Sequence, residues 1–189
     1  MDNKKQIRLH KMGLECQSFY MASQLLWDDY SISKERYEKL YPCVVNSAFT
    51  CELALKSILI KMDIPYANTH YLYTLMTKIS NGFLDIVVDG LQAIYYPDRE
   101  KEQLLNNIKS VSDMFRLFRY ISDYSVALEY QFVKNLSDFL FWCEQKLCGK
   151  IHMTCLGTLT DESEIEKIDK KLSDTFISQI IDAEKNAKK

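Results

Sequence analysis

Apolar residues recur along most of this chain at spacings of three and four, which is the period of an amphipathic helix. The strongest run lies in residues 42–62, where they form a single stripe. Pro42 suits the first turn of that helix, because the amide proton it lacks would be unpaired there in any case. The same period predicts helices over residues 7–30, 34–40, 42–62, 70–80, 83–95, 99–119 and 130–147.

The chain changes character after the helix over residues 130–147. Residues 149–160 hold two of the five glycines and are the best candidate for a linker. Thr160 and Asp161 can cap a final helix with one apolar side. The sequence therefore predicts a helical domain over residues 1–148, a linker over 149–160 and a C-terminal amphipathic helix over 161–189.

Composition supports an all-α fold. The five glycines and three prolines together make up about 4% of the 189 residues. Average usage of these two residues is roughly 12%. Sheet corners and tight turns need those residues, so a many-stranded sandwich or barrel is excluded. A helical bundle follows from the predicted helices and the absence of a convincing sheet pattern.

Charge and hydropathy indicate a cytoplasmic protein that does not associate with membranes. No stretch approaches the roughly 18 uncharged apolar residues of a membrane span, and the polar start lacks the apolar core of a signal peptide. The net charge of −2 supplies no global attraction to nucleic acid, so such binding needs a local patch. The six cysteines are expected to be free thiols.

Several enzyme classes are excluded by missing motifs. The sequence holds no P-loop, GxGxxG, GxSxG, HExxH or paired CxxC motif. ATPase, dehydrogenase and hydrolase functions are therefore not predicted, and neither is a cofactor.

A zinc site is also weakly supported. Cys143, Cys148, His152 and Cys155 lie close together in the sequence, but Cys143 and Cys148 are about 140° apart around a helix of 3.6 residues per turn. Cys143 also belongs to an apolar stripe. We expect core thiols and a loop histidine, and no bound metal.

Glu52 and His70 are candidate functional residues. Glu52 stands at the edge of the strongest apolar stripe, where a carboxylate needs a partner or water. It can pair with Lys56 one turn on, or it can line a cleft and order a catalytic arginine. His70 follows Thr69, a predicted N-cap, and is either an exposed neutral histidine or a functional one.

Residues 115–124 combine two arginines with aromatic side chains. Arg116 and Arg119 share a helix face, and the planar guanidinium donates two hydrogen bonds to a phosphate. Aromatic rings stack on bases, so this segment can form a small RNA-contacting patch. Equally, Arg119 can pair with an acid such as Glu52 or Asp123 while the phenylalanines fill the core.

Three short motifs follow one another along the chain. They are the Glu-x-Ala-Leu-Lys core that starts at Glu52, the Thr-His-x-Leu segment that starts at Thr69, and the pair Arg119-Tyr120 ahead of the last long helix. Together they resemble the HEPN domain (higher eukaryotes and prokaryotes nucleotide-binding). The resemblance covers roughly residues 12–148.

This resemblance implies an antiparallel four- to five-helix bundle that often dimerises, with functional residues along the dimer cleft. Many HEPN proteins are metal-independent ribonucleases of toxin–antitoxin and antiphage systems, with an arginine followed four to six residues later by a histidine. Histidine moves protons near neutral pH, and arginine stabilises charge on the phosphate. Here neither arginine has that histidine. With four residues between it and Arg119, Tyr124 takes the first position at which that histidine could stand. A tyrosine hydroxyl, with an ordinary pKa of about 10, is a poor general base.

Two hypotheses follow. The first is a non-catalytic HEPN-like module, expected to be a homodimer, that binds RNA, a nucleotide or a cognate partner protein through Arg116, Arg119, Tyr120 and Glu52. The alternative is a divergent ribonuclease toxin that uses Arg119 with Tyr124 or His70. A purely protein-binding helical adaptor is a third, simpler interpretation.

Overall fold

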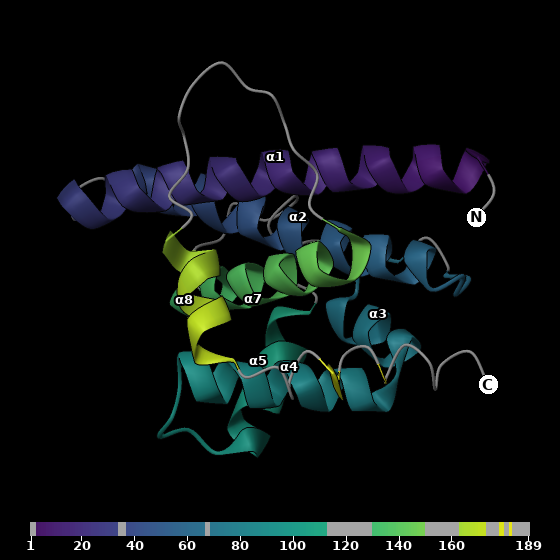
Figure 1. Ribbon diagram of the computed structural model, residues 1–189. Helices are drawn as coiled ribbons and strands as arrows, with labels where there is room; N and C mark the ends of the chain where they lie inside the picture. The colour runs from purple at the N-terminus through teal and green to yellow at the C-terminus, as the bar shows by residue number, and fades with distance from the viewer. Residues whose placement is uncertain are drawn as a thin grey trace.

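The protein is all-helical throughout the part of the chain that its structure, a computed structural model, describes: residues 3–33, 37–66, 69–112, 130–149, 163–172, 178–179 and 182. This confirms the predicted all-α class. The helices are α1 (Asn3–Ser33), α2 (Tyr37–Lys61), α3 (Leu72–Ile79), α4 (Asn81–Ile94), α5 (Lys101–Val111), α7 (Tyr130–Cys148) and α8 (Ser163–Lys171) (Figure 1).

Helices α1, α2 and α7 form the centre of the fold. Cys43 of α2 donates its Sγ–H to the carbonyl of Ser23, and Cys16 donates to the carbonyl of Thr50, so α1 and α2 run antiparallel. Tyr20 of α1 stacks on Phe141 of α7, and Gln24 bonds to Asp138 further back along α7. Helix α1 is therefore antiparallel to α7 as well, and α2 and α7 share one direction.

The remaining helices cover the other side of α2 and α7. In Figure 1, α1 lies along one side of the molecule and α4 and α5 along the opposite side, with α2 and α7 between them. Ser80 separates α3 from α4, and its Oγ accepts the amide proton of Phe83 at 2.9 Å as an N-cap. Trp142 and Phe139 of α7 are fully buried in this core.

Two details of the local predictions are wrong. Residues 37–40 belong to the same helix as residues 42–61, α2, rather than to a separate one, so Pro42 lies inside α2 and not in its first turn. Burial of α2 between its neighbours outweighs the one missing backbone bond. Thr69 is not the N-cap of α3, which begins at Leu72. Ser112, at the end of α5, accepts the amide proton of Tyr73 instead.

The apolarity of α2 reflects its central position. Within the described ranges, one helix segment, Glu38–Lys61, is long and apolar enough to cross a membrane by length and composition. However, 78% of its most apolar window is buried inside the protein, as expected for a helix packed on both α1 and α7.

Helix α8, part of the predicted C-terminal helix, packs on α7 and α4 of the same chain. Asp169 accepts a hydrogen bond from Trp142 Nε1 at 2.5 Å and pairs with Lys146 at 2.7 Å. Ile168 and Leu172 are buried in the same core as Trp142. This helix therefore completes the core rather than extending away from it.

Gly90 of α4 lies directly against the ring of Phe139 of α7. A Cβ atom at this position would overlap the ring of Phe139. We therefore expect Gly90→Ala to lower the free energy of unfolding by about 1–3 kcal/mol through overpacking, although alanine is the better helix former by about 1 kcal/mol. Urea denaturation measures the change.

Gly82 supplies the matched control in the same helix. The nearest atom to a Cβ built there is Ser80 Oγ at 3.8 Å, so Gly82→Ala is expected to leave stability unchanged or raise it slightly. Equal effects of the two substitutions would contradict the close approach of α4 and α7.

Candidate functional site

The structure brings together two residues that the sequence singles out separately. His70, just before α3, lies with its Nδ1 3.0 Å from both carboxylate oxygens of Glu52 on α2. Lys56, one turn further along α2, places its Nζ 2.5 Å from Glu52 Oε1. The predicted pairing of Glu52 with Lys56 is therefore present, and His70 joins it. We call these three residues the Glu52 cluster.

Burial differs sharply within the Glu52 cluster. The side chain of Glu52 is only 5% exposed, whereas that of His70 is 40% exposed. A buried carboxylate needs charged or hydrogen-bonding partners, and here it has two. The carboxylate also orients the ring: if Nδ1 carries the proton and donates it to Glu52, the neutral imidazole presents Nε2 as its basic nitrogen.

At its C-terminal end, α2 finishes in a turn that brings the following residues back towards α1. Asp63 has a φ of 60°, in the left-handed region, and Ile64 donates its amide proton to the carbonyl of Leu59 at 3.0 Å. With the bond from the Asp63 amide to the carbonyl of Ile60, this is a Schellman ending in which aspartate takes the place of glycine. Tyr66 follows directly after this turn.

Two cations, one from α1 and one from α2, lie near the ring of Tyr66. Arg8 of α1 donates a hydrogen bond to the Tyr66 hydroxyl at 2.9 Å, and its guanidinium carbon is 5.5 Å from the ring centroid. Lys56 Nζ lies 5.9 Å from the centroid of the same ring. Tyr66 thus links the Glu52 cluster to the N-terminal part of α1.

A hollow of about 660 Å³ opens beside Tyr66. It is lined in part by Lys4, Lys5, Arg8, Asp63, Pro65 and Tyr66, and we call it the basic hollow. Lys5 pairs with Asp63 and also donates to the carbonyl of Lys61 at 3.3 Å. Its described charged lining residues are three cations, Lys4, Lys5 and Arg8, and one carboxylate, Asp63. The basic hollow therefore favours anions.

Comparison with known proteins assigns no function to this arrangement of side chains. The chain matches no protein-family model, no curated protein and no solved structure. Function is therefore inferred from the side chains themselves.

The structure does not test several of the candidate residues that the sequence predicts. Arg116, Arg119, Tyr120 and Tyr124, like His152 and Cys155, are outside the described residues. Cys143 is fully buried, and burial raises its pKa well above the ordinary value. Across the described ranges, no group of three His, Cys, Asp or Glu side chains could hold a metal ion.

Sequence reasoning missed Arg8, Tyr66 and the two lysines of the basic hollow. The signal for the cations is the run Lys4-Lys5 followed by Arg8 and Lys11 in an otherwise weakly acidic protein. Nothing in the sequence connects that run with Tyr66, because the contact spans 58 residues.

Proposed function

We propose that this chain is a HEPN-like helical module that binds single-stranded RNA at the basic hollow and the adjoining Glu52 cluster, without cutting it. The observation that carries this proposal is the placement of Arg8 and Lys56 on one partly exposed ring, Tyr66, beside the basic hollow. The cytoplasmic location that the hydropathy pattern predicts belongs to the same proposal. So do the homodimer and the toxin–antitoxin or antiphage setting that the resemblance implies.

Cations and an aromatic ring are what a single strand of RNA requires. Lysine and arginine replace the counterions of the phosphate backbone, and a tyrosine ring offers a face on which a base stacks. The basic hollow supplies the first through Lys4, Lys5 and Arg8, and Tyr66 supplies the second. Because the whole chain carries a charge of −2, this patch is the kind of local feature that RNA binding would need.

The Glu52 cluster supports the HEPN-like part of this proposal. The Glu-x-Ala-Leu-Lys motif and the Thr-His-x-Leu motif are separate segments of the sequence, and their Glu, Lys and His side chains meet in this cluster. Helix α1 also runs antiparallel to α2 and to α7, which supports an antiparallel bundle.

RNA binding is tested by fluorescence anisotropy with a labelled single strand of mixed sequence. We expect Arg8→Ala and Tyr66→Ala each to weaken binding by about tenfold, which is 1.4 kcal/mol. For Arg8→Ala the dependence of affinity on salt should also become shallower, because one phosphate contact is lost.

The control for the charge change is Lys170→Ala, which removes one exposed cation from α8. It should bind RNA as the unaltered protein does. If Arg8→Ala and Lys170→Ala weaken binding equally, or neither changes it, the basic hollow is not the RNA site.

One observation favours cleavage as a second candidate function. Glu52 holds Nδ1 of a partly exposed histidine, which is the way a carboxylate prepares an imidazole for proton transfer. Arg119, which the sequence predicts to stabilise negative charge on the phosphate, would complete such a ribonuclease.

Incubating single-stranded RNA and tRNA without metal separates the two functions. Binding without catalysis predicts intact RNA from the unaltered protein, His70→Ala and Arg119→Ala alike. Cleavage that disappears in His70→Ala or Arg119→Ala would instead establish a metal-independent ribonuclease.

A further inference from the structure

A second cavity lies at the other end of α1. Its volume is about 430 Å³, and side chains from α1, α7 and α8 line it together with Tyr95 at the end of α4. Arg8 and Gln24 are separated by sixteen positions of α1, or about 24 Å at 1.5 Å per residue. The cavity is therefore well separated from the basic hollow.

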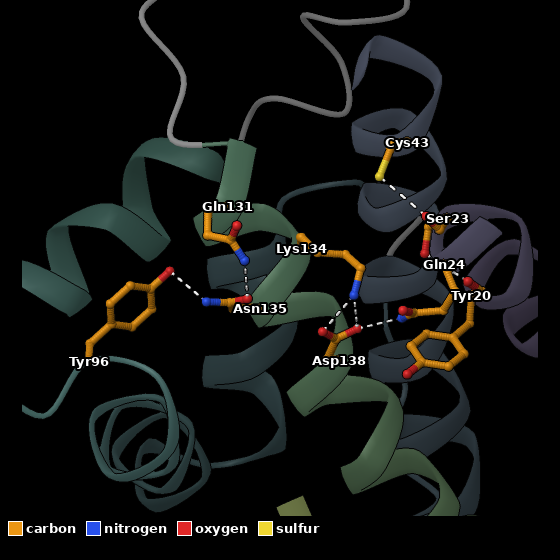
Figure 2. Close-up of polar contacts among 9 residues, drawn as sticks. All are labelled: Tyr20, Ser23, Gln24, Cys43, Tyr96, Gln131, Lys134, Asn135 and Asp138. Carbon is orange, nitrogen blue, oxygen red and sulfur yellow. Dashed lines mark hydrogen bonds and ion pairs between the residues drawn. The ribbon is translucent and has the colours of Figure 1, made fainter. Parts of the chain in front are cut away.

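A buried ion pair forms the floor of the cavity. The side chains of Lys134 and Asp138 are 3% and 2% exposed, and Lys134 Nζ lies 2.7 Å from both carboxylate oxygens. Gln24 of α1 donates to Asp138 Oδ1 at 2.7 Å. Figure 2 shows the three side chains pointing toward one another between α1 and α7.

Neighbouring hydrogen bonds hold this floor in place. Asn135, also buried, donates to the Tyr96 hydroxyl at 3.0 Å, and its carbonyl oxygen accepts a bond from Gln131 at 2.8 Å. In Figure 2 these three residues lie on the other side of Lys134 from Gln24. By contrast, Gln131 and Lys167, which also line the cavity, are exposed, so the cavity opens to the surface while its floor is buried.

The charges of the described residues that line the cavity balance. Lys134 and Lys167 are matched by Asp28 and Asp138 among the lining residues. A ligand with net charge, such as a nucleotide, would leave an excess charge in a partly desolvated site, which is costly. A ligand with one positive and one negative group would not. The ammonium of Lys134 uses two of its three protons on Asp138, so a carboxylate can accept the third.

The walls add an aromatic surface. Trp27 of α1 and Tyr95 both line the cavity, and aromatic rings favour stacked or edge-to-face contact with another ring. The volume is within the roughly 300–1,000 Å³ of small-molecule sites. We propose that this cavity binds a free aromatic α-amino acid, whose carboxylate bonds to Lys134, whose ammonium lies on Asp138 and whose ring lies against Trp27.

Isothermal titration calorimetry on the full chain tests this site, with L-tryptophan and L-phenylalanine as probes. Both should bind, and their N-acetyl forms, which have lost the ammonium and carry a net negative charge, should bind at least tenfold more weakly. Adenosine and AMP serve as comparison ligands. The proposal would be overturned if neither amino acid bound at millimolar concentration. It would also be overturned if the N-acetyl forms bound equally well, or if adenosine alone bound.

Binding measurements on variants test whether the amino acid occupies this cavity. The double substitution Lys134→Met with Asp138→Asn removes both charges together and should abolish binding, with circular dichroism to confirm the fold. Trp27→Leu, at a partly exposed position, should weaken binding by about tenfold even if the double variant does not fold. Arg8→Ala, at the distant basic hollow, should bind the amino acids normally, so this site and the RNA site succeed or fail separately. Undiminished binding by Trp27→Leu would contradict the assignment.

Discussion

Replacing Lys134 alone by methionine is expected to lower the free energy of unfolding by about 3–5 kcal/mol. The substitution would take the ammonium group away from the carboxylate of Asp138, whose side chain is 2% exposed, while the hydrogen bond from the neutral amide of Gln24 stays. An uncompensated buried charge is the costly outcome, rather than the loss of the ion pair itself. Urea denaturation at pH 7 measures the change.

Two controls test this explanation. The double substitution Lys134→Met with Asp138→Asn removes both charges and should restore most of the lost stability. Lys101→Met breaks an ion pair of similar length, 2.7 Å to Asp89, whose side chains are 60% and 44% exposed, and it should leave stability nearly unchanged. If Lys134→Met and Lys101→Met behaved alike, the floor of the cavity would not be buried as described.

Glu144→Gln is expected to stabilise the protein above neutral pH. Glu144 is fully buried, and burial raises its pKa to about 7. Its Oε2 accepts a hydrogen bond from Gln145 at 2.7 Å, whereas its Oε1 has no hydrogen-bond partner among the residues described. Nearby, burial and the charge of Glu144 raise the pKa of Cys16. The folded protein therefore favours the neutral acid.

The direction of the pH dependence follows from proton linkage. Between an unfolded pKa of about 4.3 and the folded pKa of about 7, the folded state holds a proton that the unfolded state has lost. The stabilising effect of this proton is complete below the unfolded pKa and disappears as pH rises through the folded pKa. The total loss is of the order of 3 kcal/mol.

Glutamine does not titrate, so the variant should lack this loss. The unaltered protein and Glu144→Gln should have similar stability near pH 4, and the variant should be more stable at pH 8. Urea denaturation of both proteins between these pH values gives the comparison. Parallel stability curves would show that Glu144 is not held neutral in the core.

The sequence predicted the helices themselves better than the contacts between them. The apolar stripe of residues 42–62 defined the central helix because buried side chains must repeat at the helical period. The position of Pro42 within α2 and the capping of α3 by Ser112 were missed. Both depend on tertiary packing, which local propensity does not contain.

The candidate site was predicted only in part, for a similar reason. Glu52 and Lys56 are one turn apart, so their contact follows from helix geometry alone. The contact of His70 with Glu52 depends on how the chain turns after Asp63. Lys134 and Asp138 have the spacing of an ordinary surface pair, and only the packing of α1 onto α7 shows that they are buried.

The proposed RNA site consists of Tyr66 and the basic hollow. Photo-crosslinking with RNA that contains 4-thiouridine, followed by mass spectrometry of the crosslinked peptides, shows where a bound strand lies. The predicted result is crosslinking to the peptides that hold Tyr66 and the N-terminal part of α1, on RNA that stays intact. Crosslinks confined to α5 or α8, or none at all, would contradict it.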